Sequence, residues 1–252
     1  MRSEIILKNV NLDFPIYDVE SLSIRNKISN FGKVIVNKTS TNKSGSRIVK
    51  GLKNINFNMN HGDRIALLGP NGSGKTTLLK LLAGIYSPTS GTLSKIGDIS
   101  CMLDIGFGFE QDATGYENII LSNITRGLSK DDIEKILPDI AEFSGLGEFL
   151  DMPFRTYSSG MQARLAFSSA IANTPDILLI DEFFSTGDID FSEKSKKKVL
   201  KMMDNSSILV FASHDLELLD SICNKAICMH SGEIIFSGST KEAIAQYKSI
   251  YE

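Results

Sequence analysis

The stretch GPNGSGKT, from Gly69 to Thr76, constrains the fold more than any other part of the sequence. It follows the apolar run RIALL and precedes the helical pattern LLKLLAGI, so it joins a strand to a helix, which is the context that the GxxxxGK[ST] motif requires. In such a loop, backbone N–H groups curl around phosphates, Lys75 reaches the β- and γ-phosphates, and the Thr76 hydroxyl is offered to Mg²⁺. The predicted phosphate-binding residues are Gly69, Asn71, Gly72, Ser73, Gly74, Lys75, Thr76 and Thr77.

The run ILLIDE supplies acidic groups at the end of a second apolar strand. Asp181 is predicted to hold the Mg²⁺ shell, and the carboxylate of Glu182 to orient or deprotonate an attacking water. Together with the glycine loop, this pair implies hydrolysis of a nucleoside triphosphate. The two Asn-Lys pairs, at Asn37 and Asn224, lack the aspartate of a guanine-recognition NKxD motif, so ATP is expected.

Two further stretches carry candidate phosphate contacts. His214 follows the apolar run ILVFA, where an imidazole could donate to a γ-phosphate, although a lone histidine at a strand end is more often structural. The stretch YSSGMQARLAF places two serines and a glycine at the start of a helical pattern. Because a helix N-terminus has free N–H groups and a partial positive charge, Ser158, Ser159 and Gly160 suit an anion.

The arrangement of elements predicts an α/β fold with an inserted helical lobe. Apolar residues alternate along two half-buried strands, at Ile6, Val10, Leu12 and Phe14 and again at Ile55, Phe57 and Met59. An insertion over 17–47 separates them; its first part shows helical spacing in SIRNKISNF, equally consistent with a surface helix and a docking element. In the middle segment, Ser129 is expected to cap a helix that Pro138 kinks or ends.

Composition excludes several classes of protein. The 252-residue chain has a net charge of −3, so no general nucleic-acid binding is expected. Its three cysteines, Cys101, Cys223 and Cys228, form no CxxC pair, which favours reduced, buried thiols over disulfides or a metal site. No secretory signal and no run of about 18 apolar residues is seen, so any membrane role is expected to come through a partner.

The order and spacing of these motifs resemble the ATP-binding subunit of ABC transporters over nearly the whole chain. The resemblance implies a P-loop NTPase core with a mixed sheet and an antiparallel β-subdomain, formed by 1–101 and 175–252, and a helical subdomain over 102–174. It assigns adenine stacking to Phe14 or Tyr17. It matches Ser158, Ser159, Gly160 and Met161 to the family signature, and Asp188 to the aspartate of the loop after the catalytic glutamate.

The same resemblance implies partners. Two copies are expected to pair head to tail, with each signature facing the γ-phosphate bound by the other copy, and to drive membrane-spanning permease subunits. The segments DFPIY, GIYSPTSG and DIGFGFEQDATGYENI are similar to exporters of O-antigen, capsule and teichoic acid. O-antigen is the closest match, so export of a lipid-linked polysaccharide is expected, with this subunit at the cytoplasmic face of the bacterial inner membrane.

The chain departs from the common ABC pattern in three places. The glutamine at the start of the helical lobe is missing, and Asp104 or Gln111 lies nearest that position. Ser159 and Met161 replace glycine and glutamine of the common signature, as suits the exporter group. A carbohydrate-binding domain after the closing helix, present in some O-antigen exporters, is not expected. The missing glutamine and the long insertion disfavour an importer or drug exporter. The single cassette disfavours a ribosome- or DNA-acting ABC protein, and the intact Asp181–Glu182 pair disfavours a non-hydrolysing scaffold.

Overall fold

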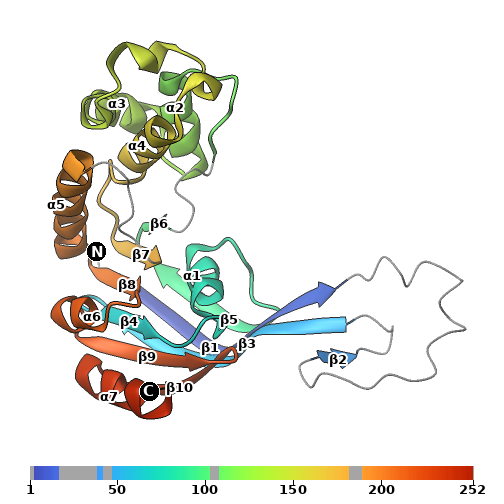
Figure 1. The fold of residues 1–252 in the computed structure, drawn as a ribbon. Helices are drawn as coiled ribbons and strands as arrows, with labels where there is room; N and C mark the ends of the chain where they lie inside the picture. The colour runs from blue at the N-terminus through green and yellow to red at the C-terminus, as the bar shows by residue number, and fades with distance from the viewer. Residues whose placement is uncertain (1–2, 17–38, 42–46, 103–107, 182–188, 252) are drawn as a thin grey trace, which may run out of the picture.

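The computed structural model describes residues 3–16, 39–41, 47–102, 108–181 and 189–251. Two sheets and a helical lobe make up this part of the chain (Figure 1). The expected short helix in SIRNKISNF, and with it most of the 17–47 insertion, lies outside the described residues.

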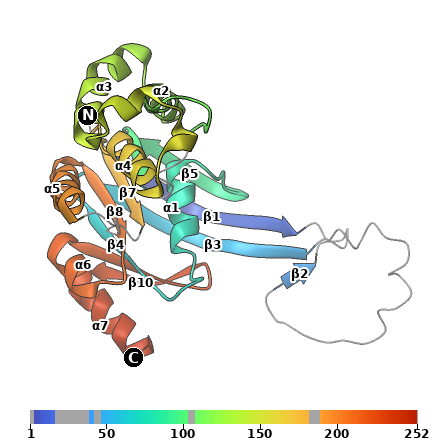
Figure 2. The same ribbon diagram turned by 45° about the horizontal axis from the view of Figure 1, so that its top comes forward.

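The first sheet is antiparallel and has four strands in the order β2-β3-β1-β5. They are β1 (Glu4–Ile16), β2 (Thr39–Thr41), β3 (Arg47–Asn60) and β5 (Ser90–Ile96). β1 and β3 are the long pair, and their ends project from the body of the molecule beside β2 (Figures 1 and 2).

The second sheet is mixed and has six strands in the order β10-β9-β4-β8-β7-β6. They are β4 (Arg64–Leu68), β6 (Ile99–Met102), β7 (Ile177–Asp181), β8 (Ile208–Ala212), β9 (Lys225–His230) and β10 (Glu233–Ser239). β9 and β10 pair antiparallel and the other pairs are parallel. The chain turns between β9 and β10 at Ser231 and Gly232, both with positive φ.

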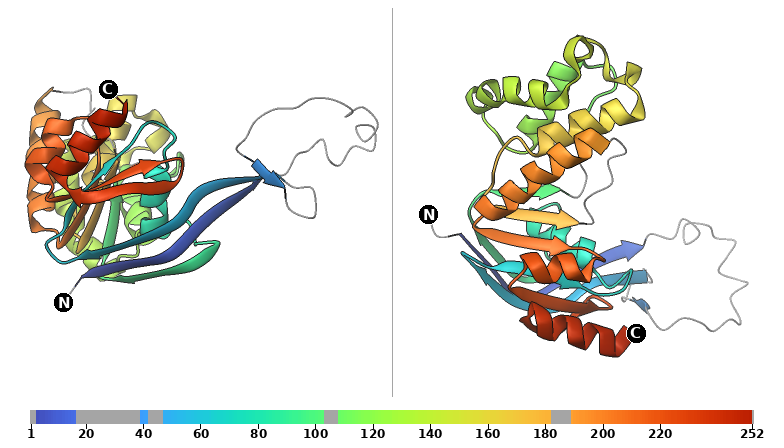
Figure 3. Two further views of the ribbon diagram at one scale, coloured as in Figure 1. Left: turned by 90° about the horizontal axis from the view of Figure 1, so that it is seen from below. Right: turned by 60° about the vertical axis from the view of Figure 1, so that its left-hand side comes forward.

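The helices divide into three groups. α1 (Lys75–Ala83) packs between the two sheets, in one apolar core with residues of β1, β3, β4, β7 and β8. α5 (Ile189–Asn205), α6 (Leu216–Ile222) and α7 (Thr240–Tyr251) contribute to a second core on the other face of the mixed sheet (Figure 3). The lobe consists of α2 (Gly115–Thr125), α3 (Lys130–Ser144), η3 (Gly147–Asp151), η4 (Phe154–Thr156) and α4 (Ser159–Ala170), around a third, smaller core.

These layers confirm the predicted α/β class, with a mixed sheet, an antiparallel sheet and helices. The residue boundaries of the predicted subdomains stay predictions. None of the helices in the described ranges has the combination of length and apolar character that crossing a bilayer requires.

One local prediction is wrong and another is narrowed. Ile6 does not share a face with Val10, because Asn9 adopts a positive φ of 51° in a bulge that shifts the register between Leu7 and Val10. Ile5 and Leu7 are therefore the buried residues before the bulge. Of the two outcomes predicted for Pro138, an end of the helix is excluded, since α3 continues to Ser144 before Gly145 caps it.

The predicted N-cap at Ser129 is confirmed, because its side chain accepts a hydrogen bond from the backbone N–H of Asp132.

Candidate functional site

The glycine loop after β4 has backbone angles that residues with a side chain rarely adopt. Gly69, Gly72 and Gly74 have φ values of 147°, 76° and 108°. A Cβ on Gly69 would overlap the carbonyl oxygen of Met229 in β9, whereas Gly72 has open space around it. The loop thus needs glycine at Gly69 both for its backbone angle and for close approach to the neighbouring strand.

Hydrogen bonds hold this loop from two sides. The Gly232 N–H donates to the carbonyl oxygen of Ser73 at 2.8 Å, and the Lys53 N–H donates to the carbonyl oxygen of Gly232 at 2.8 Å. The Lys75 ammonium donates to the carbonyl oxygens of Gly69 at 2.6 Å and Pro70 at 3.3 Å. These bonds connect the loop to the β9–β10 turn and, through that turn, to β3.

The N-terminus of α1 differs from those of four other helices in the described ranges. α2, α3, α4 and α6 have side-chain caps, from Thr114, Ser129, Ser158 and Asp215 respectively. The N-cap of α1 is Gly74, which has no side chain to cap the helix. The N–H groups of a helix's first turn have no intrahelical partner, so the first turn of α1 offers donors to an anion seated in the glycine loop.

A hydroxyl and a carboxylate meet beside the first turn of α1. The Thr76 hydroxyl donates to a carboxylate oxygen of Asp181 at 2.5 Å, although the two residues are 105 positions apart. The sheet causes the meeting, because β4 and β7 both pair in parallel with β8, and the carboxyl ends of all three strands lie at one edge.

His214 belongs to the same edge of the sheet. Ala212, the last residue of β8, is paired with Leu67 of β4 and Asp181 of β7. His214 follows two residues later, and its side chain is exposed. The sheet register therefore places His214 on the side from which the phosphate loop and Asp181 also emerge.

The signature stretch lies at the start of α4, as the sequence predicts. Its first serine has a structural role, since the Ser158 hydroxyl accepts a hydrogen bond from the Met161 N–H at 3.3 Å and caps the helix. Ser159 and Gly160 are exposed in the first turn, and Met161 is half-buried. Tyr157 is buried in the core of the lobe and anchors this end of α4.

Phe14 is a half-buried residue near the end of β1, at the side of the glycine loop. Its ring lies over Gly51 of β3, where a Cβ would come within 2.5 Å of Phe14 Cε2. The carbonyl oxygen of Gly51 in turn lies 3.3 Å from the position of a Cβ on Gly74. Phe14 also makes an edge-to-face contact with Tyr86, with ring centroids 5.2 Å apart.

Four predicted positions, Tyr17, Asp104, Glu182 and Asp188, lie outside the described residues. Gln111 is described. It lies in the lobe with an exposed side chain, and its carbonyl oxygen accepts a hydrogen bond from the Arg155 N–H at 2.9 Å.

Sequence reasoning missed three residues of this region: Gly51, Tyr86 and Gly232. Each supports the loop or Phe14 through a contact with a residue far away in the sequence. Tyr86 lies in the GIYSPTSG segment that suggested the exporter group, but nothing in its local pattern points to Phe14.

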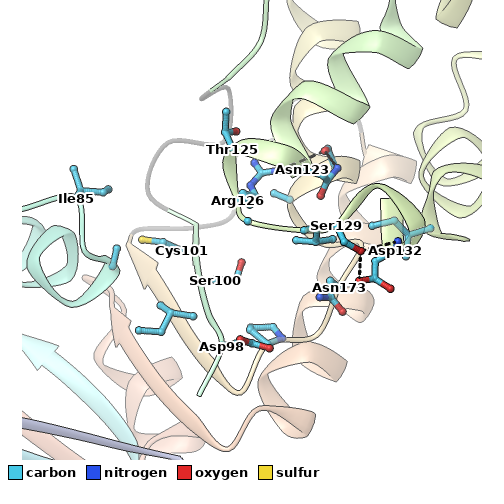
Figure 4. Close-up of a pocket in the computed structure, with 18 of the residues that line it drawn as sticks. Ile85, Asp98, Ser100, Cys101, Asn123, Thr125, Arg126, Ser129, Asp132 and Asn173 are labelled. Carbon is cyan, nitrogen blue, oxygen red and sulfur yellow. Dashed lines mark hydrogen bonds between the residues drawn. The ribbon is translucent and has the colours of Figure 1, made fainter. Parts of the chain in front are cut away.

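A cavity of about 900 Å³ separates the lobe from the core (Figure 4). Its walls come from the end of α1, from β6, from the α2–α3 connection and from α4, with Ile85, Cys101 and Arg126 among its residues. It is distinct from the phosphate loop, none of whose residues lines it.

The cysteines differ in environment. Cys101 is only half-buried, which corrects the prediction of three buried thiols, while Cys223 and Cys228 are buried as predicted. Burial raises the pKa of the Cys223 thiol to about 12 and that of the Cys228 thiol to about 11.

Comparison with known proteins gives consistent results. A family model described as ABC transporter matches residues 52–185. An O-antigen export system ATP-binding protein of Yersinia enterocolitica is 41% identical over 239 residues, covering 92% of this chain and 96% of that protein. A teichoic acids export ATP-binding protein of Listeria innocua is 38% identical over 196 residues, covering 78% of this chain and 58% of that protein.

Among solved structures, the dimeric ATP-binding cassette MJ0796 bound to ADP and Pi has a TM-score of 0.64 at 22% identity. The likeness covers 94% of this chain and 98% of that one, and it shows a common fold.

Proposed function

Because this chain belongs to the ABC transporter family, we propose that it is the ATP-hydrolysing subunit of an exporter of lipid-linked polysaccharide, O-antigen above all. The observation that carries the proposal is the meeting of Thr76 and Asp181 beside the glycine loop, at the edge of the mixed sheet. The O-antigen and teichoic-acid exporters named above support the cargo class, since the first of them aligns over nearly the entire chain.

The glycine loop and the first turn of α1 bind the phosphates of ATP. The uncapped N–H groups of α1 are donors for the phosphate oxygens. The positively charged Lys75 ammonium exchanges its hydrogen bonds to the Gly69 and Pro70 carbonyl oxygens for contacts with the phosphates. Lys75 also stabilises charge that develops on the γ-phosphate during hydrolysis.

Thr76 and Asp181 fit a magnesium site. A hydroxyl and a carboxylate are hard oxygen ligands of the kind that Mg²⁺ prefers, and here they already lie within 2.5 Å of each other. When bound, Mg²⁺ supplies charge neutralisation on the phosphate oxygens. The hydrogen bond between these two side chains holds them together.

We assign the attacking water to Glu182, which directly follows Asp181 in the sequence. Its carboxylate orients the water and accepts its proton as the water oxygen bonds to the γ-phosphorus. The bond from that phosphorus to the bridging oxygen breaks, and ADP leaves with the bonding electron pair. His214 is proposed to donate a hydrogen bond to the γ-phosphate from its position after β8.

A second copy of the chain completes the proposed site. Ser159 and Gly160 are exposed at the N-terminus of α4, and no contact within the described residues closes over Gly160. We propose that this turn caps the γ-phosphate held by the partner copy, with Met161 beside it and with Asp188 contributing at the same interface. That the cassette MJ0796 is dimeric supports the pairing of two copies.

Replacement of Glu182 by glutamine tests the catalytic assignment. Glu182→Gln should bind ATP as the unaltered protein does and should lose roughly 10²–10⁴-fold in turnover, because a positioned base is worth about that much. Phosphate release, with the permease present, and nucleotide affinity are measured side by side. Glu193→Gln, an exposed carboxylate on α5, is the matched control. Near-normal phosphate release from Glu182→Gln would refute the assignment.

The permease partner is proposed to contact the cavity between lobe and core, at the cytoplasmic face of the inner membrane. Both subdomains line this cavity, so a partner seated there would follow any movement of the lobe. The half-buried Cys101 thiol in its wall serves as a probe, since the buried Cys223 and Cys228 thiols with raised pKa values react slowly.

Assembly with the permease should slow alkylation of Cys101 by iodoacetamide several-fold, as followed by peptide mass spectrometry. Cys101→Ser gives the background from the two buried thiols. Equal labelling of Cys101 in the free and assembled protein would place the permease elsewhere.

The identity of the exported polymer can be tested in cells. Depletion of the protein in cells should cause one lipid-linked glycan to accumulate inside, and that glycan identifies the polymer; no accumulation would argue against an export role.

We propose that the 17–47 segment contacts the permease or the lipid headgroup. Deletion of residues 38–46 should then reduce export, and unchanged export would count against this role.

A further inference from the structure

We propose that Tyr86 is a positioning residue that fixes the plane of the Phe14 ring for the purine base of ATP. The inference rests on the proposed role of Phe14 as the residue that stacks on adenine. It adds a residue to which neither the sequence motifs nor the comparisons give a role.

Tyr86 is tied to the helix that begins at the phosphate loop. It follows Gly84, the C-cap of α1, and its backbone N–H donates to the Lys80 carbonyl oxygen at 3.3 Å. Its ring is half-buried against the same apolar core that the helix packs into. Tyr86 is thus a rigid support, because it is bonded to the last turn of a helix that packs between the two sheets.

The contact with Phe14 restricts one specific motion. The two rings meet edge to face, with centroids 5.2 Å apart and an interplanar angle of 75°. In this geometry rotation of Phe14 about its own axis would lose the favourable arrangement, in which the positive edge of one ring meets the negative face of the other. Tyr86 therefore selects one ring plane among those that Phe14 could adopt.

Gly51 restricts Phe14 from another direction. A Cβ at Gly51 would lie 2.5 Å from Phe14 Cε2, so only glycine leaves the ring in its present place. The ring is consequently set between Gly51 and Tyr86, a short distance from the start of α1. Stacking on a base depends on the orientation of the ring plane, and a ring that is already oriented loses less entropy when the base binds.

The test compares a purine with a pyrimidine nucleotide. Affinities for ATP and UTP are measured by calorimetry on the full chain and on Tyr86→Leu, Tyr86→Phe, Phe14→Leu and the double variant Phe14→Leu/Tyr86→Leu. Both nucleotides use the phosphate loop equally, while the larger base gains more from stacking. The ratio of the two affinities therefore isolates the contribution of the ring.

We expect the preference for ATP over UTP to fall about two- to tenfold in Tyr86→Leu, which is the range for one aromatic pair, and to be retained in Tyr86→Phe. The double variant should show no further loss beyond Phe14→Leu. Gly51→Ala, which displaces the Phe14 ring from the other side, should lower the preference in the same way while leaving Tyr86 in place.

Each other outcome overturns the inference in a distinguishable way. If Tyr86→Leu weakens ATP and UTP equally, Tyr86 supports only the fold. If Phe14→Leu lowers the preference but Tyr86→Leu does not, stacking by Phe14 stands and the positioning role is wrong. If Phe14→Leu leaves the preference unchanged, the stacking role itself fails, and the inference fails with it.

Discussion

At the scale of single residues, the glycines of the phosphate loop are not equivalent. Gly69 and Gly72 both have positive φ, but only Gly69 presses against another strand, at the Met229 carbonyl. The GxxxxGK[ST] motif requires glycine at Gly69 and leaves the residue at position 72 open, but it does not reveal that Gly69 also contacts Met229 of β9, 160 positions along the chain.

This difference predicts unequal stability losses. Gly72→Ala should cost about 1–2 kcal/mol, the usual penalty for a side chain at positive φ. Gly69→Ala should cost a further 1–3 kcal/mol or so, because its Cβ must also push the neighbouring strand away. Thermal unfolding of the nucleotide-free proteins measures both. Equal losses would mean that β9 yields to the new methyl group.

At the scale of elements, the entry to the lobe depends on Asn118, which is fully buried in α2. Its amide oxygen accepts a hydrogen bond from the Glu110 N–H at 2.6 Å. Its amide nitrogen donates to the carbonyl oxygens of Glu110, Ala113 and Thr114. One side chain thus pairs with both backbone groups of Glu110, whereas the carbonyl oxygens of Ala113 and Thr114 also accept from the backbone N–H groups of Phe154 and Asn118.

Asn118→Leu should therefore destabilise the protein by about 1–3 kcal/mol, since it removes the side-chain partner of the part-buried N–H and carbonyl of Glu110. Hydrogen exchange of residues 108–114 should accelerate in the variant. Leu121→Ala, at an exposed position of the same helix, should cost less than about 1 kcal/mol and is the control. Unchanged exchange in Asn118→Leu would show that other contacts order the loop.

The elements also show why local patterns have limited power. The phosphate-loop strand and helix follow from sequence alone, because the motif fixes both neighbours. The face of β1 does not, since the bulge at Asn9 depends on a hydrogen bond from its N–H to the side chain of Asn56, 47 positions away. Pro138 is tolerated because it lies on the exposed side of α3, where water can satisfy the carbonyl it leaves free, while Ile133 and Ile140 stay buried.

The residues of the candidate site also differ in whether the sequence could predict them. Lys75, Thr76, Asp181 and the start of α4 could be predicted because short motifs encode them. The supports at Gly51, Tyr86 and Gly232 could not, since each acts through a tertiary contact that has no pattern of its own.

At the scale of the whole molecule, one ring joins the lobe to the core. Phe191, near the start of α5, contacts Phe143 of α3 and Phe167 of α4 with centroids 5.7 Å apart in each pair. The Arg164 guanidinium of α4 lies 5.0 Å from the centre of the same ring. α5 comes directly after the segment that carries Glu182 and Asp188, so the ring connects the signature helix to the chain that follows those carboxylates.

Phe191→Ala should separate the stability of the lobe from that of the core. The cavity it leaves should cost about 3–5 kcal/mol, and Phe191→Leu clearly less. Urea unfolding followed by lobe-specific and core-specific hydrogen exchange should show two transitions in Phe191→Ala where the unaltered chain shows one. A single, unshifted transition would mean that the two parts are held together elsewhere.

The peptide at Gly232 has a mechanical consequence for the whole molecule. Its N–H holds the phosphate loop at Ser73, and its carbonyl holds β3 at Lys53. One peptide unit therefore connects β3 of the projecting β1–β3 ribbon to the phosphate loop. If the phosphate loop moves when nucleotide binds, β3 must move with it or one of these two hydrogen bonds must break. A probe attached to the projecting ribbon should therefore report on nucleotide binding from outside the site.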